Sequence, residues 1–314
     1  MADGTLREID IDLIDKNPEN PRIVFRSREL AQLMESIRKF GVQVPISVYK
    51  HQKRYVLVDG ERRWKASIKL NRKTIPALIQ GKPDALTNLL LMFNIHALRE
   101  QWDLLTIALK LPRVLELLRI QLGRDANERE IALETGLNRA VVRRSRLLMM
   151  LPSKYQQMIL RELQKPKAQQ KLSEDFFIEM ERALKTVARN MPAAFGSLSK
   201  NSIRDILIAK YLAGTIANLV HIRQIAKIAR AKRVGVDSQV AQKALEKIFN
   251  NSKYSIERAY EESVGFAYGE RDLATRIISL TEQLRHFEDT ELDQDVLDGL
   301  AALQKEIKKI LEGE

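Results

Sequence analysis

The sequence predicts an α+β domain at the N-terminus, followed by helical regions that extend to the C-terminus. Short strand-like runs of apolar residues lie between residues 6 and 79. Beyond residue 100, apolar residues recur every three or four positions, as on one face of a helix. Only 13 Gly and nine Pro occur among 314 residues, which favours long helices over many tight turns. We expect domains at residues 1–95, 96–165 and 172–314, with the polar segment 163–171 as a linker.

Several classes of protein are excluded by composition. The chain has no Cys, so disulfides, thiolate zinc sites and thiol nucleophiles are absent. No apolar run reaches the roughly 18 residues of a membrane span, and the N-terminus has no signal-peptide pattern. The four His have no ligand-like spacing. We expect a cytoplasmic protein that does not enter membranes.

The positive charge is unevenly distributed. Residues 1–95 carry 17 basic and 11 acidic side chains, and residues 96–170 carry 14 and 8. Residues 171–314 carry 22 of each, so the whole net charge of +12 lies in the first 170 residues. This division suggests a polyanion-binding portion joined to an assembly or effector portion. A generic basic surface explains the charge equally well.

The N-terminal elements follow one another in a clear order. A short strand around residues 6–11 ends at the turn-rich segment 16–22, where two prolines block a helix. Ser27 is a good N-cap for an amphipathic helix that Gly41 ends. Strands at 46–50 and 55–58 form a hairpin, a helix covers 61–70, and a last short strand covers 74–79.

The segment Gly60-Glu61-Arg62-Arg63-Trp64-Lys65-Ala66 is the chemical centre of this domain. A glycine that leaves a strand and opens a helix lets the backbone approach a ligand closely. The helix N-terminus then offers unpaired N–H groups and a positive dipole end, and two arginines add charge. These features suit a phosphate group or a DNA backbone, although a solvated helix face gives the same pattern. The phosphate-binding motif G-x-x-x-x-G-K-[ST] is absent.

Six elements over residues 9–80 together resemble the N-terminal domain of the ParB/RepB partition proteins, which is related in fold to sulfiredoxin. They include N-P-x-x-P-R at 17–22, Gly41 to Ile46, and D-G-E-R-R-W-K-A from Asp59. The resemblance implies that the triphosphate of CTP is held by Gly60, Glu61, Arg62 and Arg63. It also places residues 41–46, with Gln43, near the cytidine. Sulfiredoxin chemistry is excluded because the chain has no Cys.

The E-N-x-x-R element of that family, which contacts magnesium and phosphate, is altered here. Its Asn is retained as Asn94, its Glu is replaced by Phe93, and its Arg is displaced by two residues. Phenylalanine cannot ligate a hard cation, which needs oxygen donors. The resemblance therefore implies CTP with Mg²⁺ as cofactor, Asn94 as a nucleotide and metal contact, and at most weak CTP hydrolysis.

Residues 125–150 have the spacing of a helix-turn-helix. Gly136 stands where the turn needs positive φ, Asn138 caps the second helix, and Val142 returns to the core. Because the start of the second helix enters the major groove, we expect Arg139 and Arg143 near base edges, with Asn138 also among the DNA-binding residues. Arg144 and Arg146 are assigned to phosphates from their angle around the helix. The alternative is an ordinary helical hairpin with a basic face. Residues 147–152 extend the ParB resemblance to about residue 160.

The last region is helical by pattern. Helices are expected at 173–188, 200–212, 217–232, 238–249, 254–263, 271–287 and 292–312. Residues 221–233 hold five basic and no acidic residues, which fits either a second DNA-backbone surface or a solvated face. Apolar residues from Leu292 to Leu311 recur at spacings of three and four, as in a helix–helix seam within the domain or between two copies.

These features predict a sequence-specific, ParB-like DNA-binding protein with CTP as a switch. The resemblance implies a homodimer on a palindromic site of double-stranded DNA, in partition of a plasmid, phage or mobile element. A ParA-type ATPase is the family's partner, but the chain starts almost directly at its first strand, without the segment that stimulates it. The alternatives are a transcription or replication regulator without a CTP cycle, and a ParB-type nuclease. A nuclease needs clustered carboxylates or histidines, and the sequence pattern offers none.

Overall fold

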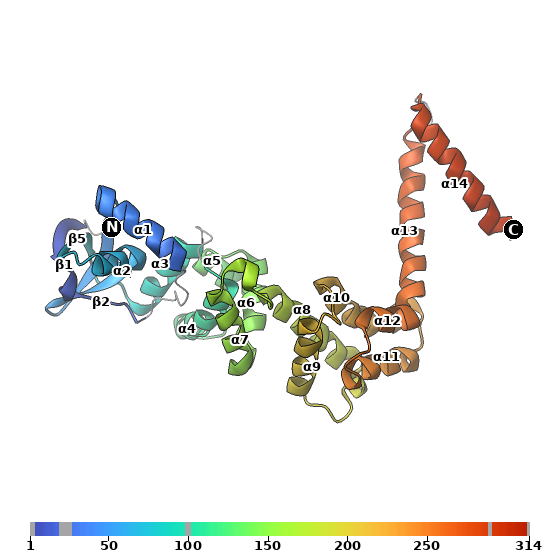
Figure 1. The fold of residues 1–314 in the computed structure, drawn as a ribbon, viewed down its shortest axis with the longest axis horizontal. Helices are drawn as coiled ribbons and strands as arrows, with labels where there is room; N and C mark the ends of the chain where they lie inside the picture. Colours follow the sequence, from blue (N-terminus) through green and yellow to red (C-terminus); the bar gives the residue numbers. More distant parts are fainter. Residues whose placement is uncertain (1–3, 19–26, 98–101, 288–290, 313–314) are drawn as a thin grey trace. The chain divides into compact units, whose positions relative to one another are not determined.

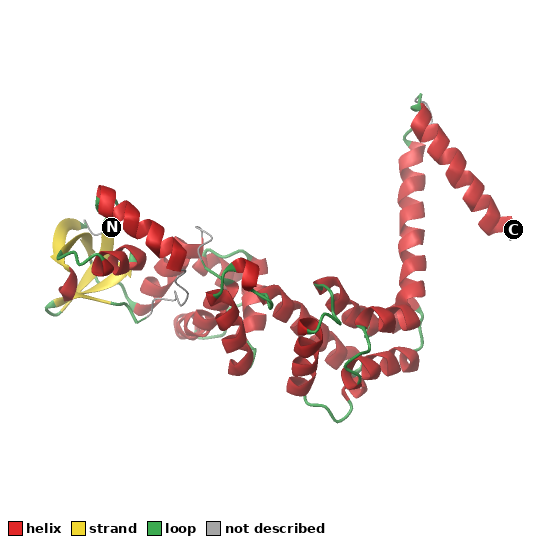
Figure 2. Ribbon diagram, viewed as in Figure 1, coloured by secondary structure: helices red, strands yellow, loops and turns green. Residues whose placement is uncertain are grey.

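The computed structural model describes residues 4–18, 27–97, 102–287 and 291–312 (Figures 1 and 2). The chain divides into two compact units, residues 1–182 and 183–314. Within the described ranges, no helix is long and apolar enough to cross a bilayer.

A five-stranded sheet forms the N-terminal part of the first unit. Its strands are β1 (Thr5–Asp10), β2 (Ile14–Asp15), β3 (Ile46–His51), β4 (Arg54–Asp59) and β5 (Thr74–Gln80), in the order β1-β5-β3-β4-β2. The predicted hairpin is confirmed, because β3 and β4 pair antiparallel. β1 runs antiparallel to β5, whereas β3 and β5 pair in parallel. Branched residues such as Ile9, Ile46, Val48 and Ile75 form its core.

Two helices pack together beside the sheet. Helix α1 (Ser27–Phe40) is followed by Gly41 at φ 73°, and α2 (Glu61–Lys69) follows β4 directly. Leu30 and Ile37 of α1 form a buried cluster with Ala66 of α2. This contact fixes α2 against the domain and thereby fixes the position of its first turn.

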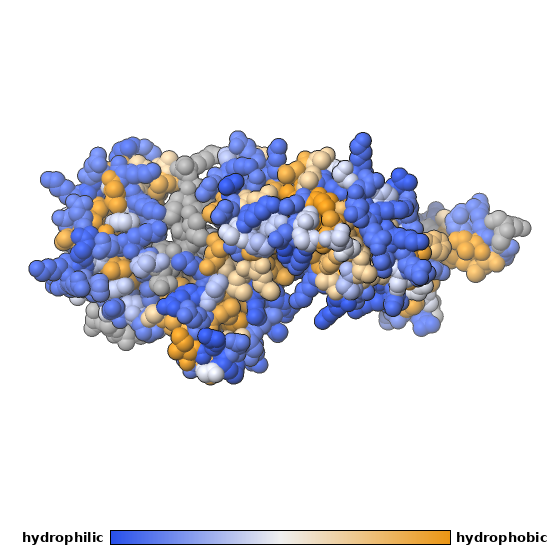
Figure 3. Space-filling view, turned by 90° about the horizontal axis from the view of Figure 1, so that it is seen from below, coloured by the Kyte–Doolittle hydropathy of each residue, from blue (hydrophilic) through white to orange (hydrophobic). Residues whose placement is uncertain are grey.

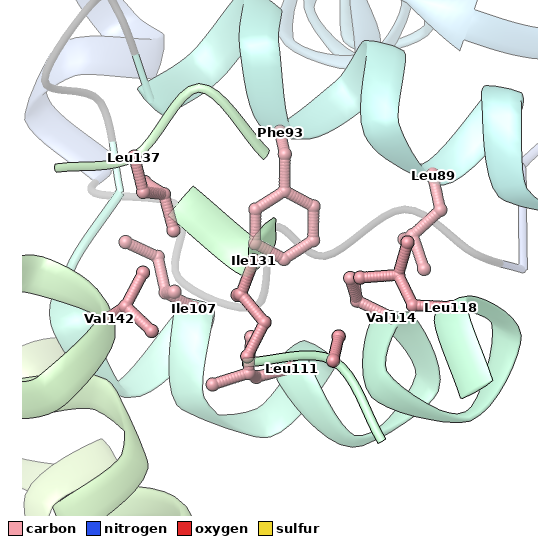
Figure 4. Packing of buried hydrophobic residues seen from close by; sticks show 10 residues of the cluster. Leu89, Phe93, Ile107, Leu111, Val114, Leu118, Ile131, Leu137 and Val142 are labelled. Carbon is pink, nitrogen blue, oxygen red and sulfur yellow. The ribbon is translucent and has the colours of Figure 1, made fainter. Parts of the chain in front are cut away.

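The rest of the first unit is helical. It contains α3 (Ala85–Ala97), α4 (Leu104–Leu122), α5 (Glu128–Thr135), α6 (Arg139–Met149) and α7 (Ser153–Gln164). Figure 4 shows side chains of α3, α4, α5 and α6 meeting in one core, including Phe93, Leu111, Ile131 and Val142. Helix α3 therefore packs with the helix-turn-helix, although the predicted boundary at residue 95 assigns it to the preceding domain.

Helix α8 (Glu174–Asn190) connects the two units, and the second unit is helical. Its helices are α9 (Lys200–Leu212), α10 (Leu219–Ile228), α11 (Ser238–Asn250), α12 (Ile256–Tyr260), α13 (Phe266–Arg285) and α14 (Gln294–Glu312). Short 3₁₀ segments cover Pro192–Phe195 and Ala231–Val234.

Two predicted helix boundaries in this unit were wrong. The helix expected at 217–232 ends at Ile228, because the chain tightens into the 3₁₀ turn around the buried Ala231. The separate helices expected at 254–263 and 271–287 are continuous, since the π-helical segment Glu261–Gly265 joins α12 to α13. Gly265 takes a helical φ of −56° there and does not break the helix.

Helices α13 and α14 bury no side chain fully among the described residues. Apolar residues of both helices and of the described chain next to them line an open groove: Leu280, Leu284, Phe287, Leu292, Val296, Leu300 and Leu303. Figure 3 shows apolar surface near the end of α14. The solvent-facing surface of α13 and α14 is therefore unusually apolar.

Candidate nucleotide and DNA interfaces

The first turn of α2 presents an open helix N-terminus. Gly60 stands at the N-cap with φ 96° and has no side chain to accept from the first backbone N–H groups. Those groups have no acceptor inside the helix. A Cβ at Gly60 would lie 2.7 Å from Cγ2 of Ile46, so the turn is closed to larger residues. The first backbone N–H groups of α2 are therefore left available to an anion, and the phosphate contact stays a prediction.

Glu61 organises lysines around that turn. Its side chain is buried, and Oε1 lies 2.8 Å from Nζ of Lys65 and 3.7 Å from Nζ of Lys16. A carboxylate repels phosphate, so Glu61 suits phosphate binding only through the two lysines that it holds. The structure thus places two further cations, Lys16 and Lys65, beside the turn predicted to bind phosphate.

Arg63 ties the turn to the preceding loop. It donates from Nη2 to Oδ2 of Asp59 at 3.1 Å and from Nη1 to the carbonyl of Val44 at 2.9 Å. The two segments expected to hold phosphate and cytidine are therefore joined by one guanidinium. Arg62, its partly exposed neighbour on α2, follows Glu61 in the first turn.

The remaining predicted nucleotide contacts are less well defined. Gln43 is exposed and donates from its amide to the carbonyl of Phe40 at the end of α1. Asn94 lies in α3, but its side chain is outside the described residues. Phe93 is fully buried and packs edge-to-face on Trp102, with ring centroids 5.1 Å apart. A glutamate at position 93 would enter the helical core, so this position does not face a metal.

The described residues therefore fit the triphosphate of CTP but do not fit a magnesium ion. Uncapped N–H groups, arginines and lysines match a triphosphate. No group of three or more acidic or histidine side chains that could hold a metal ion occurs in the described part of the chain. Asp59 and Glu61 already face Arg63 and Lys65. These residues do not form a protein-built magnesium site.

The helix-turn-helix has the predicted local geometry. Asn127 and Glu130 form a capping box at the start of α5, and Gly136 takes φ 71° at its end. Asn138 caps α6 by accepting from the N–H of Val141 at 2.8 Å. Because its oxygen is engaged in the cap, Asn138 positions the second helix.

Arg139 and Arg143 share one acidic partner. Both are exposed on α6, and their Nε atoms lie 3.2 and 2.7 Å from Oε1 of Glu128. The hydrogen bond from Arg143 is the main reason that the pKa of Glu128 is lowered. Glu128 is thus an anion placed against the two arginines expected to read bases.

Arg144 and Arg146, both assigned to phosphates from their angle around the helix, do not lie on one face of α6. In a helix with 3.6 residues per turn, Arg146 shares a face with Arg139 and Arg143. Arg144 points elsewhere and pairs with Asp175, in the first turn of α8. Arg146 therefore belongs with the exposed face of α6, and only Arg144 lies apart from it.

Comparison with known proteins identifies the family of the N-terminal domain. Residues 1–94 match the model of the ParB N-terminal domain. These 94 residues belong to the ParB N-terminal domain family. It is 31% identical over 157 residues to chromosome-partitioning protein ParB of Caulobacter vibrioides strain NA1000/CB15N, covering 49% of each chain. It is 31% identical over 160 residues to stage 0 sporulation protein J of Bacillus subtilis strain 168, covering 51% of this chain and 54% of the relative.

The ParB similarity is limited to part of each protein, because the chain spans about half the length of the curated relatives it matches. One solved structure that it resembles is the C-terminally truncated ParB of Caulobacter crescentus complexed with CTP-γ-S. Identity is 28%, the TM-score is 0.30, and the match covers 59% of this chain and 96% of that chain.

Sequence reasoning missed the acidic partners of the α6 arginines. Glu128 and Asp175 hold the arginines of α6, and Glu174 accepts from the N–H of Leu105 at 2.6 Å, at the start of α4. Asp175 and Glu174 lie far from their partners in sequence, and no local pattern marks the pairing. For Glu128 the sequence held one usable signal, because this acidic residue stands in the first turn of α5, the first helix of the helix-turn-helix.

Proposed function

We propose that this chain is a sequence-specific ParB-type DNA-binding protein that uses CTP as a switch in partition of a plasmid, phage or other mobile element. The observation that carries the proposal is the exposed basic face of α6. Buried Val142, Ser145 and Leu148 fix the opposite side of that helix, so Arg139 and Arg143 must face outward. Arginine pairs with the two acceptors of guanine in the major groove.

The nucleotide half of the proposal rests on the first turn of α2. Backbone N–H groups, Arg62 and the lysines held by Glu61 would bind the phosphates, and Arg63 would keep the 41–46 loop in place. When bound, CTP supplies negative charge that links these groups across the turn. No hydrolytic step is assigned, because the described residues offer no metal-binding cluster.

Calorimetric titration of the full chain with CTP, ATP, GTP and UTP tests this half. We expect selective binding of CTP, and a loss of about tenfold or more in the Arg62→Ala variant, as for a lost charged hydrogen bond. Lys69→Ala removes one cation from the other end of α2 and serves as the matched control. If CTP does not bind, with or without DNA, the chain is a DNA-binding regulator without a nucleotide cycle.

The DNA half is tested by selecting a binding site from random duplexes. We expect a palindromic site, and Arg143→Ala should relax preference at one base position in each half. Arg144→Ala should leave the preference intact, because that side chain faces Asp175. Identical effects of the two substitutions would contradict the orientation of α6 on DNA.

A palindromic site requires a dimer, and we assign its interface to α13 and α14. The support is the apolar groove between them and the exposure of Leu273, Ile277 and Ile278. Ile277→Glu should shift the full chain toward monomer in sedimentation, whereas Ser279→Glu adds the same charge at a polar position and should not. A wild-type monomer would remove this assignment.

A further inference from the structure

The neutral charge of residues 171–314 conceals a strong separation of charge. Residues 200–253 carry 11 basic and three acidic side chains, whereas residues 254–314 carry seven and 15. An excess of eight positive charges therefore lies in residues 200–253, which contain α9, α10 and α11. This exceeds the excess of six in residues 96–170, which contain the helix-turn-helix.

The basic residues gather where α10 ends. Lys227 lies in its last turn, Arg230, Lys232 and Arg233 follow in and beside the 3₁₀ segment, and Arg271 comes from α13. We name these five residues the basic corner. Lys232, Arg233 and Arg271 are exposed, while Ile225, Ile228 and Ala231 are buried beneath them. The apolar side of α10 thus fixes which way the cations face.

Contacts from α13 hold the corner in shape. Arg271 donates from Nη1 to the carbonyl of Arg233 at 3.2 Å, and the hydroxyl of Tyr268 donates to the carbonyl of Lys227 at 3.3 Å. Nζ of Lys227 lies 5.4 and 5.3 Å from the ring centres of Tyr260 and Tyr268. The π-helical segment sets the relative position of the two tyrosines, which belong to α12 and α13.

Helix capping does not explain all of these cations. A basic residue in the last turn of α10 offsets the helix dipole, which accounts for Lys227. Lys232 and Arg233 lie beyond the helix, and no carboxylate within the described ranges pairs with either. Nearby acids are engaged elsewhere, since Asp272 pairs with Arg276 at 2.8 Å and Asp237 caps α11. The corner is therefore left with uncompensated positive charge.

We propose that the basic corner binds the phosphate backbone of double-stranded DNA, as a second contact that does not read sequence. The choice of DNA rests on the proposed function, because a protein that holds a duplex through α6 brings more of the same polyanion to its other surfaces. Arginine and lysine bind phosphate through charge and hydrogen bonds without needing a particular base.

The test compares two triple substitutions in the full chain. Arg230→Ala/Lys232→Ala/Arg233→Ala removes three charges from the corner. The matched control, Lys185→Ala/Lys243→Ala/Lys253→Ala, removes three exposed charges elsewhere in the second unit. Binding to a random-sequence 60-base-pair duplex is measured by fluorescence anisotropy over a range of salt. The corner variant should bind the duplex with roughly tenfold lower affinity, and the slope of log K against log salt should fall in magnitude by about 3. The control should bind like the wild type.

The outcomes separate the two proposals. If wild type binds its selected site, and the corner and control variants bind the random duplex equally well, only the basic corner is refuted. If wild type binds no DNA, the proposed function fails and the corner with it. Loss of binding to vesicles containing phosphatidylserine, with duplex binding unchanged, would assign the corner to a membrane surface and overturn the proposal.

Discussion

Glu174 offers a quantitative test of how α8 is attached to the helix-turn-helix. Its carboxylate accepts from the N–H of Leu105 at the open N-terminus of α4. Burial raises the pKa of Glu174 to about 7, and the charge of Asp103 acts in the same direction. Glu174→Gln keeps an oxygen that can accept this hydrogen bond, but the side chain can no longer ionise.

The sign and size of the effect follow from the proton balance. The folded state keeps the proton of Glu174 up to about pH 7, whereas the unfolded chain releases it near the ordinary value of 4.5. The folded state therefore binds more protons between these values, and stability contributed by Glu174 is lost as the pH rises through this window. At about 1.4 kcal/mol per pKa unit, the wild type should lose about 2.5 kcal/mol relative to Glu174→Gln between pH 5 and pH 8.

Urea unfolding followed by tryptophan fluorescence measures this difference. Both tryptophans, Trp64 and Trp102, lie in the first unit, so the signal reports the part of the chain that Glu174 stabilises. Glu179→Gln, on the same helix and paired with Arg182, is the control and should keep the pH dependence of the wild type. Parallel pH curves for the wild type and Glu174→Gln would refute the argument that burial holds the proton.

Three further substitutions test the two interfaces. Gly60→Ala should cost about 2 kcal/mol or more in urea unfolding and weaken CTP binding, since φ is 96° and Ile46 occupies the space; unchanged stability would contradict the strained turn. Glu128→Gln should tighten binding to random-sequence DNA several-fold in anisotropy titrations by removing an anion beside Arg143, and weaker binding would show that Glu128 mainly orients the arginines. Phe93→Glu should destabilise the first unit by at least about 3 kcal/mol without restoring CTP hydrolysis, because it buries a carboxylate. A stable, hydrolytic variant would place residue 93 at the nucleotide.

The elements of the first unit could be predicted because their signals are local. Gly41 and Gly136 end helices at positive φ, and Asn138 caps α6 as its sequence position indicates. Two strand-like runs separated by a short polar segment identified the hairpin of β3 and β4. These signals depend on near neighbours in the chain, and the tertiary structure did not override them.

Phe93 shows what motif counting leaves out. The resemblance says only that Phe93 replaces a glutamate of the family motif, and because α3 is apolar on most sides, its pattern does not say which side is buried. Only the tertiary structure places Leu89 and Phe93 together in the helical core. The prediction of separate helices at 254–263 and 271–287 failed for a related reason. Glycine inside a helix is disfavoured, but it is tolerated when packing supports the helix.

The acidic partners of α6 determine how selective its arginines can be. A phosphate on random-sequence DNA must compete with Glu128 for Arg139 and Arg143, and it offers only charge in return. A guanine offers two acceptors matched to one guanidinium. These hydrogen bonds can compensate for the lost ion pair with Glu128, because an ion pair between exposed side chains is weak. Glu128 therefore weakens non-specific binding more than specific binding. A chain with a second, sequence-independent contact at the basic corner needs such a penalty, because added backbone affinity would otherwise hold it away from its site.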